Sequence, residues 1–168
     1  MSHAWHLALD TGARAGLRVP NVEELDRRLV GLLATDGRMS FTDLGRATGL
    51  STSAVHQRVR RLEERGVIRG YRADVDPNAL GLSLTALISV VPLDPSAPDD
   101  IPERLEHIPE IEACHSVAGK ENYVLKVRVS TPLDLEELLS RIRLDAQVNT
   151  RTTVVLSTPW EGRPIVKD

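Results

Sequence analysis

The sequence predicts an α+β protein of two units, a helical unit over residues 23–72 and a second unit over residues 82–168. Apolar residues recur with the helical period of 3.6 up to Gly66 and mainly with the strand period of 2 after it. The order strand, helix, strand then occurs twice in succession. A chain of 168 residues, 41% of them hydrophobic, has the length and composition of one globular domain or two small ones.

The segments outside these units have weaker patterns. Residues 1–22 show no consistent period, and we interpret them as a mobile N-terminal extension. Residues 67–73 predict a short strand that leaves the helical unit, as in a winged helix. Residues 73–81 predict a linker with a turn at Asp76-Pro77-Asn78, and this linker marks the domain boundary.

The segment from Ser51 to Gly66 predicts a helix with two different faces. Ser51 is a favourable N-cap, and Gly66 can take the left-handed conformation that ends a helix. An apolar stripe at i, i+4 and i+7 consists of Val55, Val59 and Leu62. The remaining positions carry groups that hydrogen-bond base edges and phosphates. The candidate DNA-binding residues are Ser51, Thr52, Ser53, His56, Gln57, Arg58, Arg60 and Arg61.

Two further helices precede this one. Ser40 and Asp43 have the spacing of a capping box, Gly45 leaves room for a partner helix, and Gly49 can take the positive φ of a sharp turn. An earlier helix carries an apolar stripe of Leu25, Leu29, Leu32 and Leu33. The arrangement is typical of a helix-turn-helix, whose second helix enters the major groove of double-stranded DNA. A helical hairpin with a solvated basic face is the alternative.

The distribution of charge supports DNA binding although the total does not. The whole chain has a net charge of -3 and a pI near 6.0. Residues 23–72 carry ten basic and seven acidic residues, whereas residues 73–168 carry nine basic and sixteen acidic ones. A net positive unit suits phosphate contact and counterion release. We therefore expect the acidic second unit to stay off the DNA.

Several classes of function are disfavoured. No apolar run reaches membrane-spanning length and no signal peptide is recognisable, so we expect a cytoplasmic, nucleoid-associated protein with no membrane partner. Cys114, the single cysteine, and His115 would point to opposite faces of a strand, which favours a small buried cysteine and a structural histidine over metal ligands. Because no nucleophile–base pair, phosphate loop or metal triad is recognisable, we predict no catalytic residues, metal or cofactor.

The second unit predicts a ferredoxin-like βαββαβ sandwich. Strands are expected over residues 82–91, 111–118, 122–129 and 148–157, and helices over residues 99–108 and from Pro132 onward. Helices on one face leave the other face of the sheet bare, and the strands carry apolar pairs that face both ways: Leu87-Ile88, Val90-Val91 and Val154-Val155. Sheet-to-sheet homodimerisation would cover this face and place two helix-turn-helix units for a palindromic operator.

These motifs resemble the Lrp/AsnC (feast/famine) transcriptional regulators. The similarity covers residues 23–157 and implies a C-terminal RAM/ACT-like effector domain, homodimers that often assemble into octamers, and DNA binding modulated by an amino acid or related small molecule. An effector-independent architectural DNA-binding protein of the same fold is the alternative. The residues that carry the similarity are Asp26, Asp36-Gly37-Arg38, Asp43-Leu44, Gly49-Leu50-Ser51, Val55, Arg58-Val59, Arg61-Leu62-Glu63 and Gly66-Val67-Ile68.

The resemblance also implies an effector site. In the family the effector lies between dimers near a Gly-x-x-Asp-Tyr segment, which here is Gly119, Lys120, Glu121, Asn122 and Tyr123, with Asn122 in place of the Asp. Thr153 and Val154, with Val155, correspond to further pocket positions in the last strand. Judged by its residues alone, the segment from Gly119 to Asn122 is equally well an ordinary β-turn.

Overall fold

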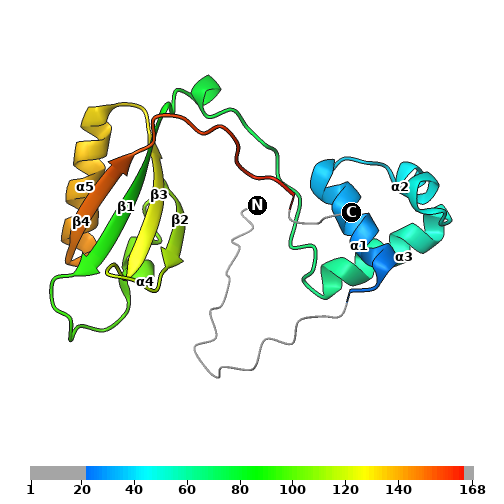
Figure 1. Ribbon diagram of the computed structural model, residues 1–168, viewed down its shortest axis with the longest axis horizontal. Helices are drawn as coiled ribbons and strands as arrows, with labels where there is room; N and C mark the ends of the chain where they lie inside the picture. Colours follow the sequence, from blue (N-terminus) through cyan, green and yellow to red (C-terminus); the bar gives the residue numbers. More distant parts are fainter. Residues whose placement is uncertain (1–21, 165–168) are drawn as a thin grey trace, which may run out of the picture. The chain divides into compact units, whose positions relative to one another are not determined.

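The computed structural model describes residues 22–164 and divides the chain into two compact units, a helical unit that ends at Arg72 and a second unit over Ala73–Gly162 (Figure 1). The expected N-terminal extension lies outside the described residues, apart from Val22. Each unit has its own hydrophobic core, so the two are described in turn.

The helical unit consists of α1 (Glu24–Thr35), α2 (Phe41–Thr48) and α3 (Thr52–Glu64), as the sequence predicts. The Ser40 and Ser51 hydroxyls cap α2 and α3, because each accepts a hydrogen bond from the backbone N–H three residues later. Gly49, with φ of 74°, ends α2. The core between the helices is formed by Leu29, Leu33, Leu44, Val55 and Val59.

The turn between α2 and α3 depends on Gly45. A Cβ atom at this position would lie 2.6 Å from the carbonyl oxygen of Leu50. The Leu50 N–H in turn donates to the Gly45 carbonyl over 3.0 Å. The two backbone segments therefore approach as closely as they do because residue 45 has no side chain.

The strand expected over residues 67–73 does not form. Within residues 22–72, which the structure describes, no strand is present, so the expectation of a winged helix is wrong there. Val67 and Ile68 instead donate their N–H groups to the Leu62 carbonyl after Gly66 takes a left-handed conformation, and Ile68 packs on the helical core. A strand needs a neighbour for its ladder of hydrogen bonds, and this unit supplies none.

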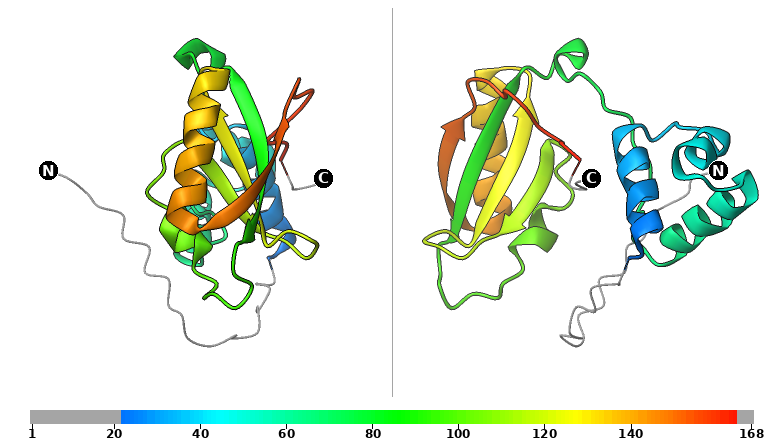
Figure 2. Two further views of the ribbon diagram at one scale, coloured as in Figure 1. Left: turned by 90° about the vertical axis from the view of Figure 1, so that its left-hand side faces the viewer. Right: turned by 45° about the vertical axis from the view of Figure 1, so that its right-hand side comes forward.

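The second unit is a four-stranded antiparallel sheet in the order β2-β3-β1-β4, which is the ferredoxin-like topology that the sequence predicts. The two α-helices of this unit lie on one face of the sheet (Figure 2). The strands are β1 (Leu84–Pro92), β2 (Ile111–Ser116), β3 (Tyr123–Val129) and β4 (Val148–Val154), and the helices are α4 (Ile101–Leu105), α5 (Pro132–Ala146) and the short 3-10 helix η1 (Asn78–Leu80).

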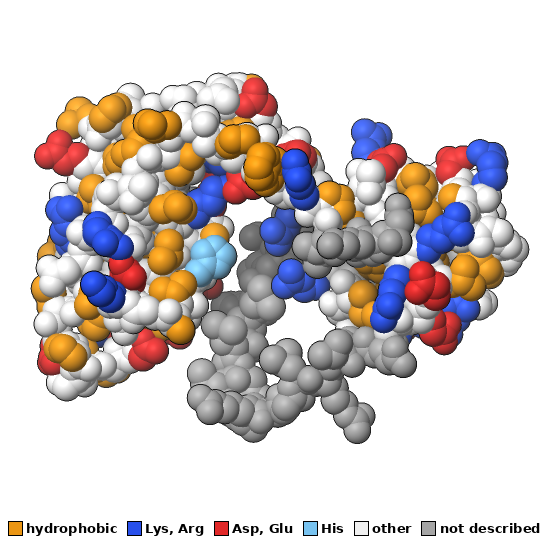
Figure 3. All heavy atoms as spheres, in the orientation of Figure 1, with side chains coloured by type: hydrophobic (Ala, Val, Ile, Leu, Met, Phe, Trp, Pro, Cys, Tyr) orange, Lys and Arg blue, Asp and Glu red, His pale blue; other side chains and the backbone are white. Residues whose placement is uncertain are grey.

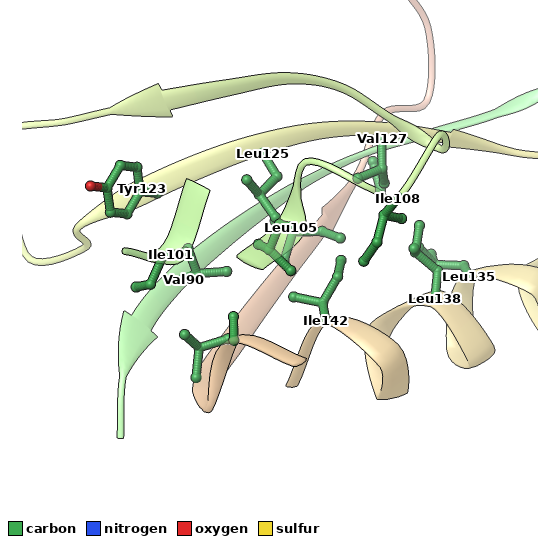
Figure 4. Close-up of a cluster of buried hydrophobic side chains, with 14 of the residues drawn as sticks. Val90, Ile101, Leu105, Ile108, Tyr123, Leu125, Val127, Leu135, Leu138 and Ile142 are labelled. Carbon is green, nitrogen blue, oxygen red and sulfur yellow. The ribbon is translucent and has the colours of Figure 1, made fainter. Parts of the chain in front are cut away.

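The core of this unit lies between the sheet and its helices. Along β3, the side chains of Tyr123, Leu125, Val127 and Val129 are buried, as the alternation predicts, while those between them are only half-buried. Figure 4 shows Leu125 and Val127 of β3 on the side of the sheet that faces Leu105 of α4 and Leu138 and Ile142 of α5. A capping box of Thr131 and Asp134 starts α5.

The edge beside β2 is covered less than expected. The helix α4 has five residues, whereas a helix over residues 99–108 was predicted, although Ile101, Leu105 and Ile108 are all buried. Cys114 lies opposite Leu125 in the register, on the helix side of the edge strand β2, yet it is exposed. The expectation of a buried cysteine is therefore wrong, because β2 is the edge strand of the sheet and has a neighbouring strand on one side only.

Candidate DNA-binding and effector sites

The outer face of α3 is the candidate DNA-binding surface. Its apolar stripe is fully packed, with Val55, Val59 and Leu62 at most 1% exposed. Because the stripe fixes the rotation of the helix, Ser53, Gln57 and Arg60 are turned toward solvent, and all three are exposed. The amide and guanidinium groups that can pair with adenine and guanine thus share one face of one capped helix.

The start of α3 gathers the hydroxyl groups of the site. Ser51, Thr52 and Ser53 are all exposed, and the Ser51 and Ser53 hydroxyl oxygens lie 3.1 Å apart. The first N–H groups of a helix have no partner within the helix, and together with the helix dipole they favour anions. This end of α3 is suited to a phosphate group.

Local contacts orient the side chains that border the outer face of α3. The His56 ring meets the Phe41 ring of α2 edge to face, with centroids 5.3 Å apart. The Arg61 side chain donates to the Gln57 carbonyl oxygen over 3.3 Å. The Arg60 guanidinium forms an exposed ion pair with Glu64 over 2.8 Å. Figure 3 shows basic and acidic side chains interspersed on one face of the helical unit.

Arg58 differs from the other candidates because it points to α1. Its guanidinium donates to Asp26 over 2.8 Å and to Glu23 over 3.0 Å, and these bonds raise the pKa of Arg58. Sequence reasoning missed both partners. One signal was present: Asp26 precedes Leu29 and Leu33 on the buried stripe of α1, and a buried carboxylate calls for a cation.

The candidate effector residues 119–123 form the turn between β2 and β3 and the start of β3. Gly119, Lys120 and Asn122 are exposed, and the Asn122 backbone is fixed by an N–H bond to the Val90 carbonyl. Glu121 forms an ion pair with Arg151 of β4. The Tyr123 ring belongs to the core, and its hydroxyl donates to Asp99 over 2.8 Å.

Thr153 and Val154 lie away from this turn within one chain. In the register of the sheet, Tyr123 is opposite Val90 of β1, whereas Thr153 is opposite Leu87. Three residues along a strand span about 10 Å, and β1 separates the two strands across the sheet. The protomer alone therefore does not bring the two groups of candidate residues together.

The open face of the sheet carries a network of charges that the sequence did not reveal. Lys126 and Arg128 of β3 both pair with Glu112, over 2.9 and 2.5 Å, and Lys126 also pairs with Glu161 over 2.6 Å. Beside it lies a polar cavity of about 440 Å³, lined in part by Asp74, Ser83, Thr85, Arg128 and Glu161.

Residues 22–164 contain neither a metal-binding cluster nor a membrane-spanning helix. No group of three or more His, Cys, Asp or Glu side chains in this range is placed to hold a metal ion. No helix in the same range combines the length and the apolar character that crossing a membrane requires.

Known protein families match both units. An AsnC-type helix-turn-helix domain matches residues 23–63, and an Lrp/AsnC ligand-binding domain matches residues 85–165. The first match contains all three helices up to Glu63, and the second contains the sheet and the turn at residues 119–123. A ligand-binding domain does not favour the effector-independent alternative.

Curated proteins and solved structures agree with the family models. The HTH-type transcriptional regulator LrpA of Mycobacterium tuberculosis is 54% identical over 84% of this chain and 95% of its own length. The leucine-responsive regulatory protein of Escherichia coli is 36% identical over 87% and 92%. A feast or famine regulatory protein of M. tuberculosis, solved with L-methionine, superimposes with a TM-score of 0.85 at 52% identity over 87% of this chain and 99% of that one.

The first of these relatives is named as a transcriptional regulator and the second as a regulatory protein, and neither is named as an enzyme. Their similarity extends over both units, and the helix-turn-helix and the ferredoxin-like domain follow one another in the same order. The chain therefore belongs to the Lrp/AsnC family of helix-turn-helix transcriptional regulators, whose second domain binds an effector.

Proposed function

We propose that α3 reads operator DNA from the major groove through Gln57 and Arg60. Ser51, Thr52, Ser53, His56 and Arg61 surround these two residues and contact the DNA backbone or neighbouring bases. The observation that carries this proposal is the exposed polar face of α3 opposite its fully buried stripe. Arg58 is left out of the set because Asp26 and Glu23 engage its guanidinium.

Selection of binding sequences from a random duplex library tests this assignment. Replacing Gln57 or Arg60 by Ala should cost about 1–3 kcal/mol and relax the base preference at one operator position. Arg61→Ala should weaken all sequences alike and lower the salt dependence of binding. Ser140→Ala, on the exposed face of α5, is the control. Equal and sequence-independent losses for Gln57, Arg60 and Arg61 would mean that a different face enters the groove.

We further propose that an amino acid or a related small molecule is the effector, and that it binds at the turn formed by residues 119–123. The L-methionine complex of the M. tuberculosis relative supports this class of ligand. Because Thr153 and Val154 lie away from the turn in one protomer, a pocket that uses both groups takes one of them from another copy of the chain. A thermal-shift screen of amino acids and oxo acids identifies the ligand, since it stabilises only the folded state.

Asn122 offers a direct test of the proposed site. If residue 122 accepts a hydrogen bond from the ligand's ammonium group, a carboxylate would bind it more strongly than an amide by about 1 kcal/mol, or about fivefold in affinity. Asn122→Asp should therefore raise the affinity for amino acids in calorimetry, with oxo acids as the matched control. Unchanged affinity for every amino acid would exclude this turn as the effector site.

The assembly is proposed on the same basis. The sheet face opposite the helices, with Leu87 41% exposed, favours a homodimer in which two sheets face each other, and the family resemblance favours further assembly to an octamer. Residues 73–81 would then link each helix-turn-helix to the dimeric domain. We place the regulator in the cytoplasm, on the nucleoid, where its double-stranded DNA partner lies.

A further inference from the structure

Arg58 occupies a special position between two helices. Its side chain is 24% exposed and that of Asp26 11%, and a 2.8 Å bond joins the guanidinium to the carboxylate. Glu23, just before α1, adds a second bond of 3.0 Å. We propose that Arg58 is a positioning residue that sets the rotation of α3 against α1, and that it does not contact DNA phosphates. This inference rests on the proposed reading of DNA by α3.

The place of Arg58 on the helix suits this role. Each residue turns an α-helix by about 100°, so Arg58 lies well around the helix from its neighbour Gln57 and beside the buried stripe of Val55, Val59 and Leu62. The other contacts of the helical core are apolar and therefore not directional. A charge-assisted hydrogen bond has a preferred geometry, and at the edge of the stripe it can fix a rotation that apolar packing leaves loose.

Burial keeps Arg58 from moving to the DNA. Asp26 is the one charged residue in the buried set among residues 22–164, with 7% of its surface exposed. If Arg58 swung away to a phosphate, the Asp26 carboxylate would remain buried without its cation, which is strongly unfavourable. Arg60 and Arg61 are free of this constraint, because the partner of Arg60 is an exposed carboxylate and that of Arg61 a backbone carbonyl.

The two roles predict opposite results at Asp26. If Arg58 contacts a phosphate, Asp26→Asn frees its guanidinium and strengthens DNA binding, while Arg58→Gln lowers the salt slope of binding by about 1. If Arg58 positions α3, both substitutions tilt the base-reading face and weaken binding. The number of neutralised phosphates then stays the same, so the salt slope is unchanged.

The experiment uses the full chain and the duplex that the wild-type protein enriches most from a random library. Wild type, Arg58→Gln, Asp26→Asn and the double variant are titrated at several salt concentrations, at a temperature where circular dichroism shows equal helix content. We expect each single variant to bind about tenfold more weakly, the double variant no more weakly than the weaker single one, and all slopes to match wild type. Glu24→Gln, which removes a 90% exposed carboxylate of α1, is the matched control.

Further variants cover the case in which Asp26→Asn does not fold. Glu23→Gln removes the more exposed partner and should give a smaller loss of affinity with an unchanged slope. In the absence of DNA, amide NMR shifts of Glu23→Gln and Arg58→Gln should change along the outer face of α3. Shifts confined to the substituted residues and their direct partners would overturn the positioning role.

The remaining outcomes separate the two proposals. Tighter binding by Asp26→Asn, or a lower slope for Arg58→Gln, would identify Arg58 as a phosphate contact. Wild-type affinity in all variants would show that the apolar core alone sets α3. A wild-type protein that binds no duplex would overturn the proposed function instead, and the NMR comparison would still decide the role of Arg58.

Discussion

Gly45 shows how one missing side chain fixes the helix-turn-helix. Alanine is favoured over glycine inside a helix by about 1 kcal/mol, so propensity alone predicts a gain for Gly45→Ala. The added Cβ would however lie 2.6 Å from the Leu50 carbonyl oxygen, a backbone atom that cannot rotate away. Overpacking of this kind costs about 1–3 kcal/mol. The difference is a net loss of up to about 2 kcal/mol in the free energy of unfolding, measured with urea.

The control for Gly45→Ala lies in the same unit. At Gly37 the nearest atom to an added Cβ is Tyr71 Cδ1 at 3.5 Å, an ordinary van der Waals contact. Gly37→Ala should change the free energy of unfolding by less than about 0.5 kcal/mol. If Gly45→Ala were as stable as this control, the turn would be able to open without loss.

Glu64 lowers the positive charge of α3, the helix proposed to read DNA. It pairs with Arg60 over 2.8 Å, and both side chains are more than half exposed. Such an exposed pair is worth about 0.2–1 kcal/mol, so Glu64→Gln should raise DNA affinity by about 1.5- to 5-fold at low salt. Filter binding at two salt concentrations would measure the effect. The same change at exposed Glu24 of α1 should do nothing, and equal gains at both positions would mean that only total charge matters.

At the scale of elements, contacts between residues close in the sequence were predictable, whereas contacts between distant residues were not. The caps and apolar stripe of α3 were predictable because Ser51, Val55, Val59 and Leu62 lie within one helical segment. The Arg58–Asp26 bond joins residues 32 positions apart, which no local period reveals. The expected strand after Gly66 lacks a neighbour, and Cys114 is exposed because its strand forms the edge of the sheet. Among the candidate effector residues, Thr153 is separated from the turn at residues 119–123 by the register of the sheet, which pairs distant segments of the chain.

In each unit, a tyrosine hydroxyl also donates a hydrogen bond to a carboxylate in another segment. The Tyr71 hydroxyl donates to Glu63 of α3 over 3.0 Å, and that of Tyr123 in β3 donates to Asp99 before α4. Burial, and then these hydrogen bonds, raise the pKa of each tyrosine to about 12 from an ordinary 10.0. The resulting stabilisation is complete below pH 10 and is lost as the pH rises toward 12, because the unfolded chain releases these protons first.

The chain contains only two tyrosines, so its tyrosinate absorbance reports on these two groups alone. In the folded protein the absorbance should rise with a midpoint near pH 12, and in denaturant near pH 10. The urea midpoint of unfolding should fall over the same pH interval. Tyr71→Phe and Tyr123→Phe should each remove half of the amplitude. A folded-state midpoint near pH 10 for either single variant would show that the hydroxyl of the remaining tyrosine is neither buried nor hydrogen-bonded.

At the scale of the whole molecule, the proposed homodimer would use the sheet face opposite the helices and bring two DNA-reading units together. Leu87 lies on this face of β1, opposite Thr153 and beside the charged cluster of β3. Lys126, opposite residue 87 in the register, already pairs with Glu112 and Glu161, so a carboxylate at residue 87 would add an unbalanced negative charge where two sheets meet. We therefore expect Leu87→Glu to convert the protein to monomers in light scattering. Leu133→Glu is the matched control, because Leu133 is 71% exposed on α5, in the opposite layer.

The same variant tests whether dimerisation serves DNA binding. In a dimer, binding of one α3 to its half-site makes the second binding step intramolecular, which can raise the overall affinity by about 10²–10⁴ without a new contact. Leu87→Glu should lose an advantage of this size on a two-half-site duplex, while its affinity for a single half-site should equal that of wild type. A monomeric Leu87→Glu variant with undiminished operator affinity would show that one helix-turn-helix suffices. If Leu133→Glu dissociated instead, the interface would lie on the helix layer, and the sheet face would be open for the effector.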